Sequence, residues 1–209
     1  MIKLERTDVC GWYSALWGMR NPMNSWNMSD TAWHSDGTFD IGKRDMDLME
    51  RLVKAGSDHR KFLRFITVTV DITAPLYWWK EFDTYKVGTV ANSCSTMHKI
   101  HAKEFTTDDF SLEHLTPDGM ECMKKTLAQL NFARMAFLET KDKMYWYEMI
   151  QLLSTSYNQT RTVLLNYEVL RNMYHARKNH KLDEWHTFCR WVEDLPYADH
   201  LITGKGDAS

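Results

Sequence analysis

The sequence is poor in several residue types that mark other classes of protein. Its 209 residues include only 9 glycines and 4 prolines, which excludes collagen-like and low-complexity fibres. The 4 cysteines are far apart and form no C-x-x-C pair, which argues against a disulfide scaffold or a zinc ribbon. Apolar runs are too short to cross a bilayer or to resemble a signal peptide. We therefore expect a cytoplasmic protein with reduced cysteines and no membrane association.

Basic residues are also not in excess. The formal net charge is −2, from 26 basic and 28 acidic side chains, so we expect no binding to duplex nucleic acid. Large side chains are abundant instead, with 9 Trp, 9 Tyr, 9 Phe and 13 Met. Such side chains serve a core, a subunit interface or a pocket for a planar ligand, and composition alone favours the first two.

Hydrophobic periodicity and helix-capping residues predict a chain that mixes helices and strands. Thr116 is the expected N-cap of the longest helix, with Pro117 at its first position. The predicted helices cover 12–20, 44–55, 75–85, 117–139, 143–153, 166–180 and 182–193, and the predicted strands cover 62–72, 86–91 and 160–165. We therefore expect one α/β (α+β) domain over 1–209, with a central twisted sheet, long flanking helices and a disordered tail at 204–209.

Two polar clusters are candidate sites. Asn166, Asn172 and Arg177 lie along one side of a predicted helix, where a guanidinium and two amides suit the carbonyls of a pyrimidine or flavin ring, or a phosphate. A solvated helix face is the alternative. The turn Asn92–Thr96 carries several hydroxyls that suit a phosphate, although it lacks the glycines of a P-loop. An ordinary capped turn is the alternative there.

Metal and nucleophile chemistry have weaker support. His98 and His101 are three residues apart, but no Cys, Asp or Glu stands at a recognisable partner spacing, so we expect no metal site. The sequence also lacks the G-x-S-x-G turn of serine hydrolases. We therefore do not expect a hydrolase.

Three collinear stretches resemble the flavin-dependent thymidylate synthases. The strongest is LNYEVLRNMYHAR at 165–177, which has the family's Asn, Asn and Arg in the same order and at the same offsets. The stretch HRKFLRFITVTVDITAPLYWWKEF at 59–82 resembles the family's His-headed strand, Ala-Pro turn and next helix. SALWGMR at 14–20 resembles its first helix. Together these matches span most of the chain.

The resemblance implies a homotetramer that converts dUMP to dTMP. Methylenetetrahydrofolate would be the carbon donor, FAD the hydride carrier and NADPH the reductant. The flavin would do the demanding chemistry while the protein orients rings and supplies charge. The residues that the resemblance assigns to the site are Arg177 as catalytic and uracil-binding residue, His59, Lys86, Asn166 and Asn172 at the cofactor, and Asn92 and Ser95 at the nucleotide.

The sequence departs from the family at three arginines, which appear here as Thr84, Met97 and Glu168. Each lost charge-assisted hydrogen bond costs on the order of 1.5–3 kcal/mol, or roughly tenfold or more in affinity. The candidates for compensation are Lys86, Arg64, Arg161 and Arg171. Three functions follow as alternatives: a thymidylate synthase, a related enzyme that acts on another pyrimidine nucleotide, and a binding protein that keeps the fold without the cofactor.

Overall fold

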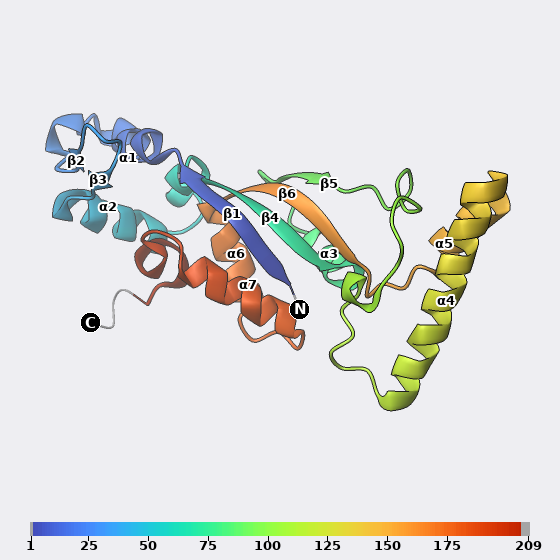
Figure 1. Ribbon diagram of the computed structural model, residues 1–209. Coiled ribbons are helices and arrows are strands. Elements are labelled where there is room, and N and C mark those ends of the chain that lie inside the picture. The colour runs from blue at the N-terminus through green and yellow to red at the C-terminus, as the bar shows by residue number, and fades with distance from the viewer. Residues whose placement is uncertain (1, 206–209) are drawn as a thin grey trace. The chain divides into compact units, whose positions relative to one another are not determined.

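The computed structural model describes residues 2–205, which form a mixed α/β fold (Figure 1). A four-stranded sheet has the order β1-β4-β6-β5, with β1 at Lys3–Cys10, β4 at Thr67–Pro75, β5 at Val90–Ser93 and β6 at Asn158–Asn166. A separate two-stranded sheet pairs β2 (Ala32–Trp33) with β3 (Phe39–Asp40) antiparallel. The predicted fold class, a central sheet with long helices, is confirmed.

The helices account for most of the remaining chain. The longer ones are α1 (Trp12–Arg20), α2 (Lys43–Lys54), α3 (Leu76–Phe82), α4 (Pro117–Thr140), α5 (Lys143–Leu152), α6 (Tyr167–Arg177) and α7 (Asp183–Glu193). Short helical turns are η1 (Asn21–Met23), η2 (Trp26–Met28), η3 (Arg60–Arg64), η4 (Thr107–Asp109) and the π-helical η5 (Asp199–Thr203). Within the part that the structure describes, no helix is long and apolar enough to span a bilayer.

Strands β4 and β6 run antiparallel. The hydroxyl groups of Thr73 and Thr160 are 2.7 Å apart, and the Thr162 hydroxyl donates to Asp71 at 2.7 Å. Residue numbers therefore rise along one strand as they fall along the other. Strand β6 leads directly into α6, and Asn166 stands at the junction. This connection fixes the start of the helix that carries most of the candidate site.

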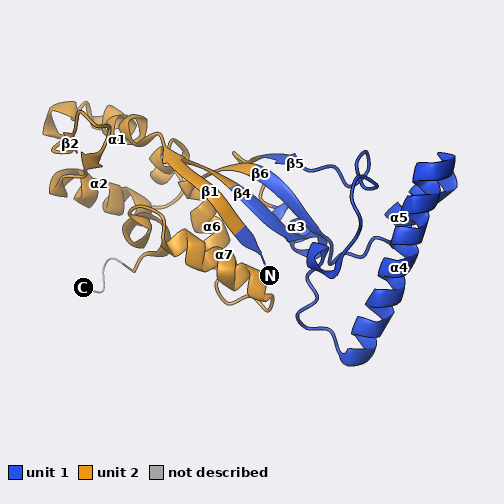
Figure 2. Cartoon of the chain, viewed as in Figure 1, with its two compact units in different colours: residues 1–3, 71–84, 91–162 blue, residues 4–70, 85–90, 163–209 orange. Residues whose placement is uncertain are grey.

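The chain divides into two compact units, each built from separate segments (Figure 2). One unit comprises 1–3, 71–84 and 91–162, and the other comprises 4–70, 85–90 and 163–209. The single domain over 1–209 stays a prediction. Of the predicted tail, residues 204 and 205 are described, and 206–209 lie outside the described residues.

The unit that contains 91–162 has a core between α4 and α5. Met123, Leu127, Leu130 and Met149 are buried there, and aromatic side chains pack around them. The Thr116 hydroxyl caps α4 by accepting from Gly119 N at 3.2 Å, and Pro117 is the first helical residue. The predicted start of this helix is therefore confirmed.

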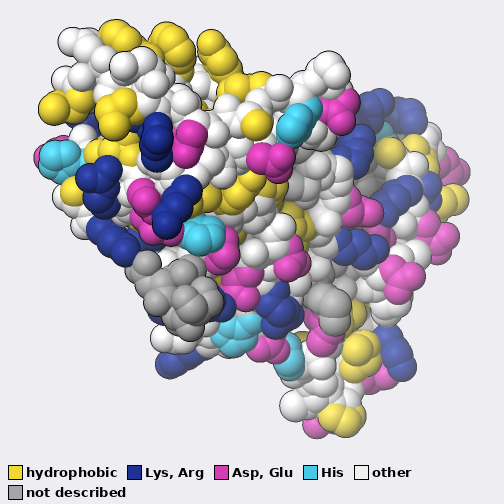
Figure 3. Space-filling view, turned by 90° about the vertical axis from the view of Figure 1, so that its left-hand side faces the viewer, with side chains coloured by type: hydrophobic (Ala, Val, Ile, Leu, Met, Phe, Trp, Pro, Cys, Tyr) yellow, Lys and Arg dark blue, Asp and Glu magenta, His cyan; other side chains and the backbone are white. Residues whose placement is uncertain are grey.

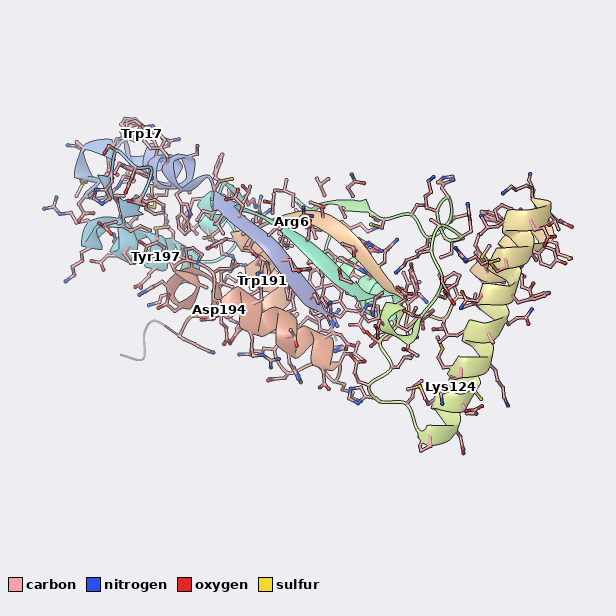
Figure 4. The ribbon with its side chains drawn as sticks, in the orientation of Figure 1. Arg6, Trp17, Lys124, Trp191, Asp194 and Tyr197 are labelled. Atoms are coloured by element: carbon pink, nitrogen blue, oxygen red, sulfur yellow. The ribbon has the colours of Figure 1, made fainter. Side chains whose placement is uncertain are left out.

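The unit that contains 163–209 packs α1, α6 and α7 around buried side chains such as Leu16, Leu170 and Phe188. On α7, Trp191 donates through its indole nitrogen to the Thr7 hydroxyl of β1 at 3.0 Å (Figure 4). The same unit contains a fully buried carboxylate, Asp45, on α2.

The strand predicted over 62–72 is misplaced at its start. Residues Arg60–Arg64 form the 3-10 turn η3 and β4 begins at Thr67, because α1 and α6 pack against η3 and Phe62 and Leu63 are buried there without strand pairing. Pro75 ends β4 and is the N-cap of α3, one position before the predicted place. The short strand predicted over 86–91 begins only at Val90, as β5.

Strand β1 was not predicted. Its sequence, KLERTDVC, is charged, and most of its side chains are exposed. Such a strand suits the edge position that β1 occupies, because charges on an edge discourage pairing with other chains. The alternation that marks a half-buried strand is therefore missing from its sequence.

Candidate functional site

Asn166 joins the end of β6 to the start of α6. Its Oδ1 accepts from Val169 N at 2.9 Å, which caps the helix, and its Nδ2 donates to Gly88 O at 3.3 Å. The backbone of Gly88 has φ +74, and a Cβ atom there would lie 2.4 Å from Asn166 Nδ2. Asn166 is 6% exposed, so it serves first as a buried link between α6 and the segment 85–90. Its contact with a flavin stays a prediction.

Arg177 ends α6 and is held among aromatic side chains. Its Nε donates to the Tyr85 hydroxyl at 3.0 Å. The guanidinium carbon lies 5.0 Å from the centre of the Trp185 ring and 5.6 Å from that of Tyr85, within the range of cation–π attraction. Trp185 is fully buried, which gives the guanidinium a rigid support. Arg177 is half-buried and therefore ordered without being removed from the surface.

A charged cluster lies on the first turns of α6. Arg60, from η3, donates through Nε to Glu168 Oε1 at 3.1 Å and through one Nη to Asn172 Oδ1 at 3.4 Å. Glu168 is 7% exposed, and its Oε2 accepts no hydrogen bond within residues 2–205. The structure thus places a guanidinium directly beside the acidic residue that stands where the resemblance expects arginine.

The sequence does not single out Arg60 as a residue of the site. Arg60 follows His59 immediately, but its role depends on a partner 108 positions later in the chain. A signal was present, since a glutamate replacing an arginine on a buried helix face requires a cation nearby. The sequence does not show which of its many basic residues fills that place.

The remaining predicted site residues are exposed and fall into both units. His59 precedes η3, and Lys86 lies in the segment 85–90, in the same unit as α6. Asn92, on β5, and Ser95 belong to the other unit. Ser95 Oγ accepts from the backbone N–H groups of residues 97 and 98, at 3.2 and 2.9 Å, which is an ordinary hydroxyl-capped turn. Their roles toward ligands stay predictions.

Two of the arginines that could replace the family's missing arginines make hydrogen bonds within the fold instead. Arg161 bonds Asp83 at 2.9 Å and Gln159 at 3.0 Å. Arg171 donates to the backbone carbonyl of Ile202 at 2.7 Å. Arg64 is exposed at the end of η3.

A cavity of about 300 Å³ lies beside α6 in the same unit. Its lining includes Arg171 and His175 from α6 and His200 from η5. Burial and the charge of Arg60 lower the pKa of Arg171, and Glu168 opposes them. Burial and Arg171 also lower the pKa of His175. The cavity therefore lies within the electrostatic reach of the Arg60–Glu168 pair.

The described part of the chain offers no group of three or more His, Cys, Asp or Glu side chains that could hold a metal ion. The candidate site instead combines guanidinium groups, side-chain amides, one buried carboxylate and aromatic faces. These groups can hold a planar ring that carries carbonyl oxygens, or a phosphate.

The fold is that of the flavin-dependent thymidylate synthases. Two crystal structures of ThyX, the flavin-dependent thymidylate synthase of Helicobacter pylori complexed with FAD and dUMP, are similar over nearly the whole chain. One has a TM-score of 0.69 at 16% identity and covers 97% of this chain and 98% of that chain. The other has a TM-score of 0.68 at 15% identity and covers 98% of both chains.

A third similar structure is PolB, a UMP/dUMP methylase of Streptomyces cacaoi bound with 5-Br dUMP. Its TM-score is 0.61 at 11% identity, and the match covers 96% of this chain and 91% of that chain. No protein-family model and no curated protein sequence matches this chain. The similarity is therefore one of fold, carried by a sequence that has diverged widely.

Proposed function

We propose that this protein is a flavin-dependent enzyme that methylates dUMP to dTMP, with methylenetetrahydrofolate as carbon donor and NADPH as reductant. The observation that carries the proposal is Arg177, fixed between Tyr85 and Trp185 at the end of α6, within a fold shared with enzymes complexed with FAD and dUMP. A guanidinium held in place before a ligand arrives loses little entropy on binding it.

The donor set of the site fits a flavin nucleotide. Arg60 and Arg177 offer guanidinium N–H groups, and Asn172 offers a side-chain amide on the same helix. Next to the Arg60 guanidinium, Glu168 Oε2 is a buried acceptor without a hydrogen-bond donor in the described chain. The guanidinium and amide N–H groups complement the carbonyl oxygens of a flavin or uracil ring, or a phosphate.

The protein's own residues would bind and polarise the rings. FAD, once reduced by NADPH, would supply the hydride that completes the methyl group, methylenetetrahydrofolate would supply the carbon and leave as tetrahydrofolate, and the C5 hydrogen of the uracil would leave as a proton. Arg177 would hold the uracil ring and draw electron density toward its carbonyl oxygens, which stabilises negative charge that develops in the ring. Asn172, His59 and Lys86 would bind the cofactor, and Asn92 and Ser95 the nucleotide.

The visible absorption spectrum of the freshly purified protein tests this proposal directly. We expect flavin bands, or their appearance after FAD is added and excess is removed. Conversion of dUMP to dTMP with methylenetetrahydrofolate and NADPH should follow. Colourless protein that binds no added FAD would contradict the proposal and favour a binding protein that has kept only the fold.

A second candidate is methylation of a different pyrimidine nucleotide. Thr84 and Met97 replace two arginines of the resembled family, and Ser95 caps its own turn. The similarity to a UMP/dUMP methylase also favours this reading. Thermal-shift measurements with a panel of uracil and cytosine nucleotides, with and without the 2′-hydroxyl, would separate the candidates. A clear preference for dUMP would end the second.

We also propose that the protein forms a homotetramer in the cytoplasm. Large apolar side chains are exposed on α4 and α5, where Phe132 is 58% and Tyr147 54% exposed. In the other unit, α1 and the segments after it expose aromatic residues, including Trp17 at 48% (Figures 3 and 4). Exposed patches of this kind commonly become subunit interfaces. The exposed thiols of Cys10, Cys94 and Cys122 suit a reducing compartment.

A further inference from the structure

The Arg60–Glu168 contact is a buried ion pair with an unusual position. Glu168 lies on the second residue of α6, two residues after the cap Asn166, and is almost completely buried. Arg60 reaches it from η3 and is itself mostly buried, with 19% of its side chain exposed. Bringing both charges out of water costs free energy that their mutual attraction offsets only in part, so the pair is not explained by stability alone.

The geometry of the pair leaves part of the guanidinium available to hold a neighbour. Arg60 uses Nε toward Glu168 Oε1, at 3.1 Å, and one Nη toward Asn172 Oδ1, at 3.4 Å. A guanidinium has five N–H groups, so these two contacts do not exhaust it. Arg60 makes one hydrogen bond to the Glu168 carboxylate, not a bidentate pair. A second N–H group of the guanidinium is therefore directed toward Asn172.

The two arginines of α6 itself hydrogen-bond other groups. Arg171 is on the same helix but donates to the backbone carbonyls of Leu201 and Ile202, in the region of η5. Arg177 lies about 13 Å beyond Glu168 along the helix, at about 1.5 Å per residue, and contacts Tyr85. Of the cations in residues 2–205, Arg60 is the one that hydrogen-bonds both Glu168 and Asn172.

We propose that Arg60 supplies the cofactor-binding guanidinium of this site and that Glu168 is the residue that positions it. The guanidinium that the resemblance expects on α6 is supplied by Arg60 on η3. Glu168, which stands at the expected position on α6, holds Arg60 by a hydrogen bond. Arg60 would donate to an oxygen acceptor of the flavin nucleotide, a ring carbonyl or a phosphate. This inference rests on the proposed function, since it assumes that the site binds FAD.

The test is a charge-exchange series on the full-length protein, read by FAD binding. The variants are Arg60→Gln, Arg60→Glu, Glu168→Arg and the double exchange Arg60→Glu with Glu168→Arg. Arg51→Gln is the matched control, because Arg51 is exposed on α2 and bonds only its own helix, to the carbonyl of Asp47, in the contacts described. Dissociation constants come from quenching of flavin fluorescence, and thermal unfolding of each apo variant reports whether it folds.

We expect Arg60→Gln to weaken FAD binding about tenfold or more, the effect of one charge-assisted hydrogen bond. Each single reversal places two like charges together and should both weaken binding and lower the unfolding temperature. The double exchange should recover both properties relative to the single reversals. Arg51→Gln should bind FAD like the wild type. Riboflavin, which has the flavin ring but no phosphate, is measured in parallel to separate the two acceptors. If Arg60 contacts the ring, Arg60→Gln weakens the binding of both ligands. If Arg60 contacts a phosphate, the variant weakens the binding of FAD alone.

Three results would overturn the inference, in whole or in part, and they are distinguishable. If the wild type binds FAD and Arg60→Gln binds it equally well, Arg60 does not contact the cofactor and the proposed function is untouched. If the wild type binds no FAD under any condition, the proposed function falls and this inference falls with it. A double exchange no better than either single reversal would show that Glu168 does not position Arg60.

Discussion

Gly88 is a residue whose importance comes from a neighbour 78 positions away in the sequence. Its carbonyl accepts a hydrogen bond from Asn166 Nδ2, and its backbone has a positive φ, which residues with a Cβ atom rarely adopt. The absence of a side chain therefore allows the segment 85–90 to approach α6 closely. That segment carries Tyr85, which contacts Arg177, so the approach also places part of the candidate site.

We predict that Gly88→Ala destabilises the protein by roughly 1–3 kcal/mol, because the new methyl group meets Asn166 Nδ2 and the backbone is strained. Urea unfolding checks this. Gly37→Ala is the control, since it has a similar positive φ but no atom within 4 Å of the added Cβ. Equal losses in the two variants would show that strain alone, without the contact, accounts for the effect.

Arg177→Ala should abolish turnover of dUMP while leaving the fold intact. The guanidinium is half-buried against two rings, so its removal costs some packing. We expect kcat/KM to fall by at least a hundredfold, on the order of 2.7 kcal/mol of transition-state stabilisation. The measurement is single-turnover conversion, with circular dichroism to confirm folding. Arg190→Ala, an exposed change on α7, is the control, and retained activity in Arg177→Ala would refute the assigned role.

At the scale of elements, Asp45 on α2 gathers the segments around it. It is completely buried and accepts from Arg20 Nε of α1 at 2.7 Å and from Thr31 Oγ1 at 2.6 Å. The Ser29 hydroxyl and two backbone N–H groups of the same loop also donate to it. One carboxylate thus links α1, α2 and the segment between them. No sequence motif predicts this network.

This network makes part of the stability depend on pH. Burial tends to raise the pKa of Asp45, but hydrogen bonds from Thr31, Ser29 and Arg20 outweigh it and the pKa is lowered. A carboxyl whose pKa is lower in the folded state stabilises the fold above its unfolded value, near 4, and this contribution is lost as pH falls through the folded value. We predict a steep loss of stability below about pH 4.

Urea unfolding between pH 7 and 3 checks this prediction. Asp45→Asn should lower stability at pH 7 by roughly 3 kcal/mol or more, because Arg20 loses its buried partner. It should also flatten the pH dependence. Asp40→Asn, an exposed change on β3, should keep the wild-type slope, and an unchanged slope in Asp45→Asn would show that other carboxylates dominate.

Elements with local signals were predictable, and those that depend on distant partners were not. Helix α4 was found with its cap because Thr116, Pro117 and a long apolar period are consecutive in sequence. The sequence predicts a strand where η3 lies, because Phe62 and Leu63 resemble strand residues and their burial depends on other segments. Of the candidate site, α6 and Arg177 could be singled out from sequence, whereas the contact between Arg60 and Glu168 could not.

At the scale of the whole molecule, the exposed apolar side chains should control assembly. We predict that Phe132→Glu together with Tyr147→Glu lowers the mass in solution from about four times 24.7 kDa toward that of one chain. In the assembled protein each introduced carboxylate would be buried in an apolar interface without a cation to pair with, which destabilises the assembly. Light scattering after size exclusion measures the mass. The control is Lys124→Glu with Lys125→Glu on exposed positions of α4, and an unaffected mass in the first variant would place the interface elsewhere.

The discontinuous make-up of the two units has a consequence for biosynthesis. Residues 4–70 leave the ribosome well before residues 163–209, with which they share a unit. Contacts between segments so far apart in sequence form slowly, because a long loop must close first. The aromatic side chains of α1 therefore stay without their partners from residues 163–209 until that later segment has been synthesised, and this interval is when the growing chain is most prone to aggregate.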